Sequence, residues 1–557
     1  MSTYIVTSAP PNPNGDLHLG HLSGPFLGAD ILTRHLRQRG HDVRHVGYSD
    51  EHSCYVPRRA AEVGATAHET ALRFGNRMEE TLYLGGMHHD WFTRPLTTPR
   101  HTETVQRFFT GLWERGRLRV RELPVFHCAG CDRHLYEAEV RGECQFCREP
   151  SDGVYCEACG LPQDPAGLAA PRCTACRQEP EIRTLRRIVF PLEDYRQQLL
   201  DYYARAQQET EWRPRLRAYL NTLLADELPE TPISRLADYG IPVPLADWDG
   251  HILDTWFSGI FGYLAATGCL YDAEGRPGRG EELWRDPATR IVNFIGFDCS
   301  FSHAALWPAL LLAHGGMTLP SQIVTNEFYR LEGGKFSTSR GHAIWGGEFL
   351  RRVSPDALRL HLSLTGPERE QSNFSMKEFT DTVETVLVDG LEDWSRTLLR
   401  WLDEDFEGVV PDTEPDAGPL AATLGELAGE VAVALSAESF SPNRATAALT
   451  TAISQAAGRL PVLARLRRAA EAEGDAAGER RAEYARHLLA HVDALALVVV
   501  TAAPIMPGWS ALLAQHLGLA RDPWTGLPRW PEDVAAPLVP RGGRLAGEPA
   551  PFFHGAE

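Results

Sequence analysis

Four C-x-x-C pairs in one segment restrict the fold of this chain more than any other feature. They are Cys128/Cys131, Cys144/Cys147, Cys156/Cys159 and Cys173/Cys176, which together hold eight of the eleven cysteines. Pairs of thiolates on tight turns suit tetrahedral Zn²⁺, and eight ligands make two closed sites with no open position for catalysis. The segment is therefore expected to fold as zinc knuckles around two structural zinc ions. Disulfides are the alternative, and the lack of a secretion signal disfavours them.

The composition is that of an ordinary globular protein. The 557 residues, 43% of them hydrophobic and 23% charged, suffice for three or four domains. The N-terminus lacks a basic stretch followed by an apolar run, and the most apolar segment, 495–503, is too short to span a bilayer. We expect a cytoplasmic enzyme with no membrane segment. The isolated Cys54, Cys269 and Cys299 are expected to be buried apolar residues.

The formal net charge of −19 argues against a surface covered with basic groups for nucleic acid. A local basic patch can still bind RNA on an acidic protein, so the charge neither requires nor excludes tRNA. Arginine-rich stretches at 465–468 and 480–481 are candidates for such a patch, although solvated helix faces are the favoured interpretation.

The order of patterns along the chain predicts a split α/β domain. Residues 1–115 alternate strand-like runs, such as 4–7 and 43–46, with helical patterns, and this alternation returns at 230–325. The insertion at 116–229 carries the cysteine pairs and then a mostly helical stretch. We therefore predict a parallel, Rossmann-type nucleotide-binding domain that is split by a zinc-knuckle insertion.

The remaining chain predicts helices. From residue 383 the composition shifts to Ala, Leu, Glu and Arg with helical period, broken by turns near 407–418 and 472–477. An α-helical bundle is expected at 383–535. A loop and linker region at 326–382 would precede the bundle, and an extended, Pro- and Gly-rich tail at 536–557 would follow it.

Two donor-rich elements, far apart in the sequence, indicate one ATP site. The first is His18-Leu19-Gly20-His21, which follows a strand and a glycine-containing turn and begins a helix near Leu22. Its histidines and backbone N–H groups would face anions at a positive helix terminus. The second, Gly333-Gly334-Lys335-Phe336-Ser337-Thr338-Ser339, offers a lysine and three hydroxyls to a polyphosphate. These donors suit attack of a carboxylate on an α-phosphate, where charge builds on phosphate oxygens.

The pair resembles the HIGH and KMSKS signatures of class I aminoacyl-tRNA synthetases, and the surrounding text is similar to the methionyl branch. Pro13-Asn14-Gly15-Asp16-Leu17-His18 matches that family's P/A-N-G-x-I/L-H run. The resemblance continues at residues 40–43, 49–52, 253–257, 293–298 and 303–308. It covers the catalytic part well and the C-terminal part loosely. It also implies a nested arrangement of the cysteines, with the two inner pairs sharing one zinc and the two outer pairs the other.

The resemblance implies roles at the ATP site. His18, His21 and Lys335 would be the catalytic residues, with both histidines on the phosphates of ATP and Lys335 closing over them. The other ATP-binding residues would be Gly296, Asp298, Ser337 and Ser339, with Asp298 on the ribose. The family uses ATP together with Mg²⁺.

The resemblance also implies a site for the amino acid. Asp50 lies where the family places the carboxylate that pairs with the α-ammonium group, and Arg235 resembles the arginine that supports it. The side-chain pocket would be walled by Trp256, Tyr263, His303 and Trp307. Such an aromatic box suits a flexible, polarizable side chain such as that of methionine.

Two departures from the family pattern affect this chemistry. Pro10 and Asn12 replace the usual Leu and Tyr of the pocket, and Ser302 replaces a usual Phe, so the pocket is expected to be more polar or larger. Thr338 replaces the second lysine of KMSKS, which removes a cation from the leaving pyrophosphate. Losing a preorganised donor of this kind costs about 3 to 4 kcal/mol of transition-state stabilisation, for which Arg340 would compensate.

Two further departures lie in the bundle. Asp389, Asp393 and Thr397 stand where the family shows Asn, Asn and Arg that read the anticodon, with Arg396 one position away. The Pro-Trp pair that stacks on an anticodon base is replaced by the stretch 457–459, and no tryptophan occurs between Trp401 and Trp509. Since RNA readout relies on aromatic stacking, anticodon recognition by the usual means is not expected.

Three functions follow as alternatives. The first is ATP-dependent activation of an amino acid and its transfer to tRNA, as in methionyl-tRNA synthetases. The second is a paralogue that transfers the acyl group to a small-molecule amine or hydroxylamine, similar to hydrazine-forming enzymes with a synthetase-like domain. The third is a non-catalytic RNA-binding relative, which the retained His18, His21, Asp50, Asp298 and Lys335 disfavour.

Overall fold

The computed structural model describes residues 1–152, 154–163, 166–336, 342–416, 418–522, 525–533 and 536–553. Its centre is a parallel sheet in the order β15-β14-β1-β2-β3. The strands are β1 (Thr3–Ser8), β2 (Asp42–Tyr48), β3 (Trp91–Thr93), β14 (Arg290–Gly296) and β15 (Gln322–Asn326). Strands from both sides of the insertion pair directly, because β1 lies against β14. The predicted split Rossmann-type domain is confirmed.

Successive side chains of the central strands point to opposite faces of the sheet and belong to two different apolar cores. Along β1, Tyr4 and Val6 belong to one core and Ile5 to the other, and Val292 and Ile291 of β14 divide in the same way. This follows from the two-residue period of a strand. The helices before the insertion are α1 (Leu19–His21), α2 (Leu27–Gln38), α3 (Tyr55–Val63), α4 (Ala67–Leu84) and α5 (Pro99–Glu114), with a π-helical turn, η1 (Leu22–Phe26), between α1 and α2.

The insertion forms two small sheets and a helical part. One sheet has the order β10-β9-β4-β5 and the other β7-β6-β8. Their strands are β4 (Arg119–Cys128), β5 (Arg133–Leu135), β6 (Val140–Glu143), β7 (Pro150–Ser151), β8 (Ala169–Cys173), β9 (Glu181–Pro191) and β10 (Glu230–Pro232). Helices α6 (Arg196–Glu209) and α7 (Pro214–Leu223) follow β9.

The chain then returns to the catalytic domain. A sheet of β11 (Ser234–Leu236), β13 (His251–Leu253) and β12 (Ile241–Pro242) precedes the helices α8 (Thr255–Ser258), α9 (Gly262–Ala273), α10 (Arg279–Arg285) and, after β14, α11 (Trp307–His314). Short helical turns η6 (Phe297–Cys299) and η7 (Ser302–Leu306) connect β14 to α11. After β15 come β16 (Tyr329–Leu331), β17 (Gly334–Lys335), α12 (Gly346–Leu350), α13 (Pro355–Thr365) and β18 (Ser372–Phe374).

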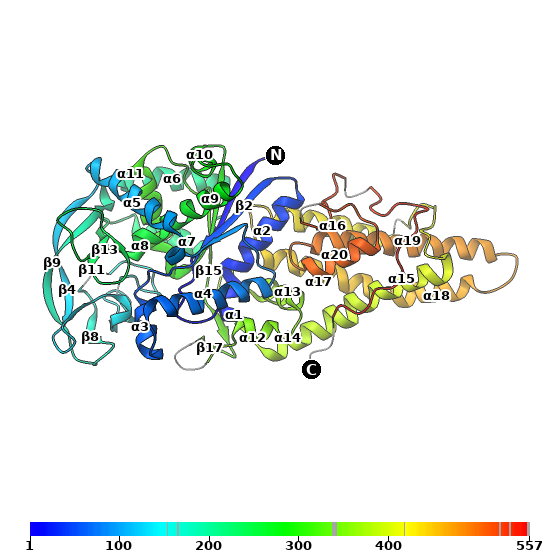
Figure 1. The fold of residues 1–557 in the computed structure, drawn as a ribbon. Coiled ribbons are helices and arrows are strands. Elements are labelled where there is room, and N and C mark those ends of the chain that lie inside the picture. Colours follow the sequence, from blue (N-terminus) through cyan, green and yellow to red (C-terminus); the bar gives the residue numbers. More distant parts are fainter. Residues whose placement is uncertain are drawn as a thin grey trace.

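The C-terminal part is helical, as predicted, and extends away from the sheet on the side opposite to the insertion (Figure 1). Its helices are α14 (Met376–Thr382), η9 (Val383–Glu392), α15 (Asp393–Phe406), α16 (Pro419–Ala434), α17 (Pro442–Ala457), α18 (Leu460–Ala470), α19 (Ala477–Ala502) and α20 (Pro507–His516). Helix α19 is longer than the apolar run in the sequence suggested, and it is apolar enough to cross a membrane. Its most apolar window is 83% buried, as in the core helix of a bundle.

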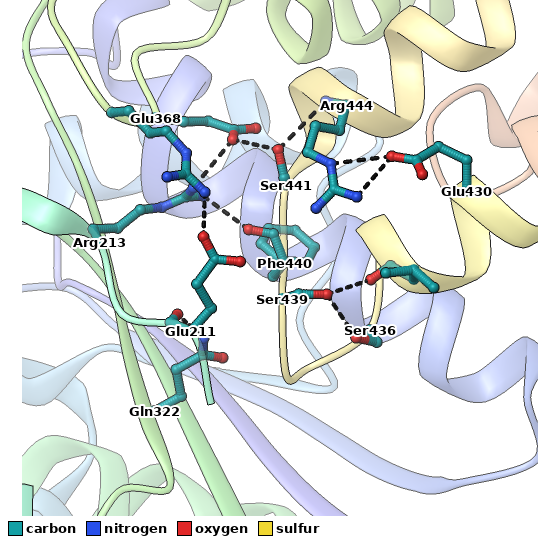
Figure 2. A network of polar contacts seen from close by, with 12 residues as sticks. Glu211, Arg213, Gln322, Glu368, Glu430, Ser436, Ser439, Phe440, Ser441 and Arg444 are labelled. Carbon is teal, nitrogen blue, oxygen red and sulfur yellow. Dashed lines mark hydrogen bonds and ion pairs between the residues drawn. The ribbon is translucent and has the colours of Figure 1, made fainter. Parts of the chain in front are cut away.

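Polar contacts join the bundle to the catalytic half. Glu368 accepts hydrogen bonds from Arg213 at 3.2 Å and from the hydroxyl of Ser441 at 2.7 Å, so it links the insertion to the start of α17 (Figure 2). Arg359 of α13 forms an ion pair with Asp30 of α2 at 2.6 Å, with both side chains almost fully buried. Arg359 also donates to the carbonyl oxygens of Pro504 and Ile505, which follow α19.

Candidate active site

A cavity of about 360 Å³ lies at the carboxyl ends of the central strands. Its walls come from residues 10–21 after β1, from Asp50 after β2, from Asp298 after β14, and from the insertion. The order of the sheet reverses between β1 and β14. Open α/β sheets bind ligands at such a switch point, outside the carboxyl ends of the strands.

His18 and His21 occupy the start of α1 and line this cavity. Each ring accepts a hydrogen bond from the other residue's backbone through Nδ1, at 3.3 and 3.2 Å. The two rings stack with their centroids 3.7 Å apart, and Phe336 stacks on His18 at 4.6 Å. A side chain at Gly20 would press on the rings of His18 and Phe336, so glycine leaves room for both.

Both histidines are neutral hydrogen-bond donors in this arrangement. Desolvation by the surrounding protein lowers the pKa of His18 to about 2 and that of His21 to about 4. A neutral imidazole whose Nδ1 accepts a bond carries its proton on Nε2. The pair therefore has two ring N–H groups that no other described residue binds and that are free for an anion. The backbone N–H groups of His18 and His21, which were also expected to face anions, are instead bonded to the two rings.

Asp298 follows β14 in the turn η6 and lines the same cavity. A Cβ atom at Gly296 would collide with the Asp298 carboxylate, so glycine at this position lets the carboxylate fold back against the strand end. Burial and the negative charge of Glu157 raise the pKa of Asp298 to about 6, and Lys335 opposes this shift. The structure thus brings Gly296 and Asp298 to the edge where His18 and His21 lie.

Lys335 reaches toward the insertion. It lies in β17, and its Nζ is 2.8 Å from Oε2 of Glu157, which lines the cavity. Lys335 also lies over the ring of Phe328 at 5.4 Å. The other predicted residues of this loop, Ser337 and Ser339, and the substituted Thr338 and Arg340, lie outside the described residues.

Asp50 lies in the cavity wall just after β2. Burial, together with the charge of Glu137, raises the pKa of Asp50 to about 8, and Arg235 acts in the opposite direction. Arg235 itself is buried and contacts Glu137 at 3.4 Å, Asp254 at 3.9 Å and the hydroxyl of Thr255 at 3.0 Å. Arg235 forms its ion pairs with Glu137 and Asp254, and its positive charge acts on Asp50 from a greater distance.

The predicted aromatic box forms two layers. Trp256 and His303 line the cavity. Tyr263 and Trp307 are fully buried, with ring centroids 6.0 and 6.1 Å from that of His303. Their place behind His303 makes them supports of the pocket wall, and the indole N–H of Trp256 donates to Glu137.

A chain of hydrogen bonds fixes the orientation of His303. The Tyr263 hydroxyl lies 3.0 Å from Nε2 of His303, Nδ1 lies 2.8 Å from Oγ of Ser302, and Ser302 donates to the carbonyl oxygen of Cys299 at 2.9 Å. Burial lowers the pKa of His303 to about 4, so the ring is neutral. Because both ring nitrogens have protein partners, His303 offers no free ring nitrogen to a substrate.

The substituted pocket residues are divided between two places. Pro10 and Asn12 line the cavity, and the amide of Asn12 donates to Ser53 at 2.5 Å. Ser302 lies outside the cavity lining, and its hydroxyl bonds to His303. Ser302 was expected to make the pocket wall more polar. Because its hydroxyl does not line the cavity, it can affect a substrate only by orienting His303.

The eight paired cysteines gather into two groups of four. Cys128, Cys131, Cys173 and Cys176 form one group and Cys144, Cys147, Cys156 and Cys159 the other, each with its sulfur atoms within 4.8 Å of one another. Sulfur separations across the groups, such as 3.6 Å for Cys147–Cys156 and 3.9 Å for Cys131–Cys173, match the spacing of about 3.8 Å that a tetrahedral zinc with Zn–S bonds of about 2.3 Å requires. None of the eight forms a disulfide. The nested grouping is confirmed, and the donor set suits structural zinc.

The inner knuckle also supplies a wall of the cavity, which sequence reasoning missed. Asp152, Val154, Tyr155 and Glu157 all line it. The hydroxyl of Tyr55, from α3, donates to Asp152 at 2.6 Å. No motif in the sequence marks these residues, because their place depends on how the insertion packs on the sheet.

The bundle face that carries Asp389, Asp393 and Arg396, where the resemblance places the family's anticodon readers, is covered in part by the C-terminal tail. Asp389 and Asp393 are exposed, whereas Arg396 forms an ion pair with Glu548 of the tail at 2.5 Å. Glu392 accepts the backbone N–H of Phe552 at 3.1 Å. The tail is thus bound along α15 and η9.

Comparisons with known proteins agree with this geometry. The family described as tRNA synthetases class I (M) matches residues 4–398. The methionine–tRNA ligase of Thermomicrobium roseum is 35% identical over 412 residues, which cover 74% of this chain and 70% of that protein. The methionine–tRNA ligase of Methanopyrus kandleri is 33% identical over 419 residues, which cover 75% of this chain and 62% of that protein.

Solved structures show the same fold. The methionyl-tRNA synthetase of Mycobacterium tuberculosis bound by methionyl-adenylate superposes with a TM-score of 0.79 over 99% of this chain and 100% of that chain, at 21% identity. Its free state superposes with a TM-score of 0.69. The likeness therefore includes the helical bundle as well as the catalytic half.

Proposed function

Because the chain belongs to the class I aminoacyl-tRNA synthetases, as a ligase related to the methionine–tRNA ligases, we propose that it activates an amino acid with ATP to an aminoacyl-adenylate. One observation carries this proposal. His18, His21, Asp50 and Asp298 come from three separate strand ends and line one cavity. A protein that only binds RNA has no need of this assembly.

The geometry suggests how the residues act. A carboxylate oxygen of the amino acid attacks the α-phosphorus of ATP, the bond to the bridging oxygen breaks, and pyrophosphate leaves with the electron pair. The Nε2–H groups of His18 and His21 meet the charge that develops on the phosphate oxygens, and Lys335 meets the leaving pyrophosphate. Asp298 holds the ribose hydroxyls. ATP would enter with Mg²⁺, which neutralises part of the phosphate charge.

The amino acid would be held at both of its ends. Asp50 takes the α-ammonium group, whose charge stabilises the ionised carboxylate. The side chain would lie against the rings of His303 and Trp256, which line the cavity. Methionine is the first candidate, because the similar proteins of known name are methionine–tRNA ligases. Because Pro10 and Asn12 line the cavity where the family has Leu and Tyr, the substrate could also be an amino acid with a different side chain.

For the second half-reaction we propose transfer to the terminal ribose of tRNA, since the relatives are methionine–tRNA ligases. A small-molecule acceptor, an amine or hydroxylamine, is the second candidate. The ion pair of Arg396 with Glu548 favours the small-molecule acceptor. It neutralises a cation of the bundle face, which also carries the exposed carboxylates of Asp389 and Asp393. That face offers RNA phosphates repulsion rather than attraction.

Pyrophosphate exchange tests the first half-reaction. The purified protein, incubated with ATP, labelled pyrophosphate and each of the common amino acids, should exchange label with at least one of them. His21→Asn should reduce exchange by 10²–10³-fold, about the effect of removing one oxyanion donor. Undiminished exchange in that variant would refute the site. Acylation of bulk tRNA by the wild type, measured in parallel, separates the two acceptors.

A further inference from the structure

Tyr48 contributes a buried tyrosine side chain to the wall of the cavity. It is the last residue of β2, and it is 1% exposed. Its hydroxyl oxygen is buried and has no hydrogen-bond partner in the part of the chain that the structure describes. Because buried polar groups in proteins are nearly always hydrogen-bonded, an unpaired hydroxyl beside a cavity indicates that a ligand supplies the missing partner.

Tyr48 lies in the part of the cavity that would take the amino acid. Its ring packs edge-on against that of Tyr263, with the centroids 5.2 Å apart, and Tyr263 bonds to His303 of the pocket wall. Two residues after Tyr48, the chain reaches Asp50, the proposed partner of the α-ammonium group. The hydroxyl therefore belongs to the amino-acid site.

Two glycines make room for this side chain. A Cβ atom at Gly262 would lie 2.6 Å from the ring of Tyr48, a collision that glycine avoids. A Cβ atom at Gly259, which lines the cavity, would lie 3.2 Å from the Tyr48 hydroxyl oxygen. Apart from its chain neighbours and the backbone of its own helix, it would meet no other atom of the described residues within 4 Å. The space in front of Gly259 is thus open and leads to the hydroxyl.

The other polar groups of the aromatic wall already have protein partners. Tyr263 and His303 bond to each other, and the indole N–H of Trp256 donates to Glu137. Burial raises the pKa of Tyr48 well above that of an ordinary tyrosine, so its hydroxyl keeps the proton and can donate it. Tyr48 can therefore give the substrate a hydrogen bond that these three residues do not supply.

We infer that Tyr48 is a specificity-determining residue, whose hydroxyl donates a hydrogen bond to an acceptor atom in the side chain of the amino acid. The inference rests on the proposed activation of an amino acid, and it names the class of substrate. The side chain carries a sulfur or oxygen acceptor and is not a pure hydrocarbon. Methionine belongs to this class, because its thioether sulfur is a weak acceptor. A hydrocarbon side chain would bury the hydroxyl unpaired.

Pyrophosphate exchange with pairs of amino acids of similar shape tests the inference. Each amino acid that the protein activates is compared with the analogue in which a CH₂ or CH₃ group replaces the acceptor; for methionine this is norleucine. The wild type should prefer the member with the acceptor about fivefold in kcat/KM, the worth of one hydrogen bond. Tyr48→Phe should bring the ratio below about twofold by lowering kcat/KM for that member alone. Gly259→Ala, which fills the space in front of the hydroxyl, should also lower the ratio.

A matched variant and the remaining outcomes decide the matter. Tyr271→Phe removes the hydroxyl of another buried tyrosine, which lies outside the cavity lining and accepts a bond from Arg44, and it should keep the wild-type ratio. An unchanged ratio in Tyr48→Phe, an equal loss for both members, or a best substrate without an acceptor in its side chain would overturn the inference alone. A wild type that exchanges pyrophosphate with no amino acid would refute the proposed function, and the inference with it.

Discussion

Lys335 and Glu157 are 178 positions apart in the sequence and form an ion pair of 2.8 Å at the border of the cavity. The contact joins the loop that carries Lys335 to the inner zinc knuckle. Since the negative charge of Glu157 also acts on Asp298, the three groups form one electrostatic unit beside the proposed ribose site.

Replacing either member of this pair should affect ATP use in opposite directions. Lys335→Ala removes a donor to pyrophosphate and should lower the rate of exchange by 10²–10³-fold. Glu157→Gln frees Lys335 for the phosphates and should lower the KM for ATP about two- to threefold, the size expected for a weak, exposed ion pair. Both effects are measured by pyrophosphate exchange at a saturating concentration of the amino acid while the concentration of ATP is varied. A KM for ATP that rises in Glu157→Gln would contradict the proposed competition.

The binding of the amino acid should depend on pH through Asp50. Its pKa of about 8 means that the free protein carries a neutral Asp50 carboxyl below that pH. An α-ammonium group needs the carboxylate, so the KM for the amino acid should fall by up to about tenfold per pH unit from pH 6 to 8 and then level off. His18 and His21, with pKa values of about 2 and 4, add nothing in this range. Asp50→Asn should bind weakly with no such slope, and a KM independent of pH in the wild type would exclude this role.

The bond between Tyr263 and His303 should tune the pocket without taking part in the chemistry. Tyr263→Phe removes the donor to Nε2 of His303 and should raise the KM for the amino acid about five- to tenfold, the worth of one hydrogen bond, with kcat little changed. Thr267→Val is a control on the same helix, because the Thr267 hydroxyl bonds to the backbone carbonyl oxygen of Tyr263 and to Trp284 and makes no bond to His303. Equal KM values in wild type and Tyr263→Phe would show that His303 keeps its orientation without this bond.

Removal of zinc should disorder the insertion and one wall of the cavity. A strong chelator should release two zinc ions per chain, and limited proteolysis should then cut within residues 128–176. Cys144→Ser should lower the zinc content from two to one, whereas Cys269→Ser, at a buried cysteine outside both groups, should leave it at two. Full retention of two zinc ions in Cys144→Ser would rule out the assigned ligand set.

The buried pair of Asp30 and Arg359 should matter for stability. Burial alone would raise the pKa of Asp30, but Arg34 and Arg359 outweigh it and the pKa is lowered. Arg359→Met leaves Asp30 with one partner in the core and should cost about 3 kcal/mol or more of unfolding free energy, measured by urea denaturation. Arg351→Met, at an exposed arginine, should cost well under 1 kcal/mol. A stable Arg359→Met protein would mean that the pair is replaceable by packing.

The features that local chemistry determines were predictable from the sequence. The spacing of the cysteines predicted two metal groups, and the strand, turn and helix start around His18 predicted an anion-facing site. The central sheet followed from strand patterns on both sides of the insertion. In each case neighbouring residues contain the signal.

The features that depend on tertiary packing were not predictable. Glu137, Asp152 and Glu157 reach the cavity only because the insertion lies over the sheet edge, and no periodicity encodes that contact. Tyr263 and Trp307 matched a pocket pattern, but their depth behind His303 is set by packing of α9 against α11. The partnership of Arg235 with Glu137 likewise joins residues 98 positions apart.

The apolar core on one face of the sheet continues without a break into the bundle. Val292 of β14, Leu358 of α13, Trp394 of α15 and Val498 of α19 all belong to it. A hinge between catalytic half and bundle would have to open this shared interior to water, at a cost proportional to the apolar area exposed. Any motion that admits substrates must therefore arise outside this shared core, as in the knuckle insertion, while the bundle and the sheet move as one rigid frame.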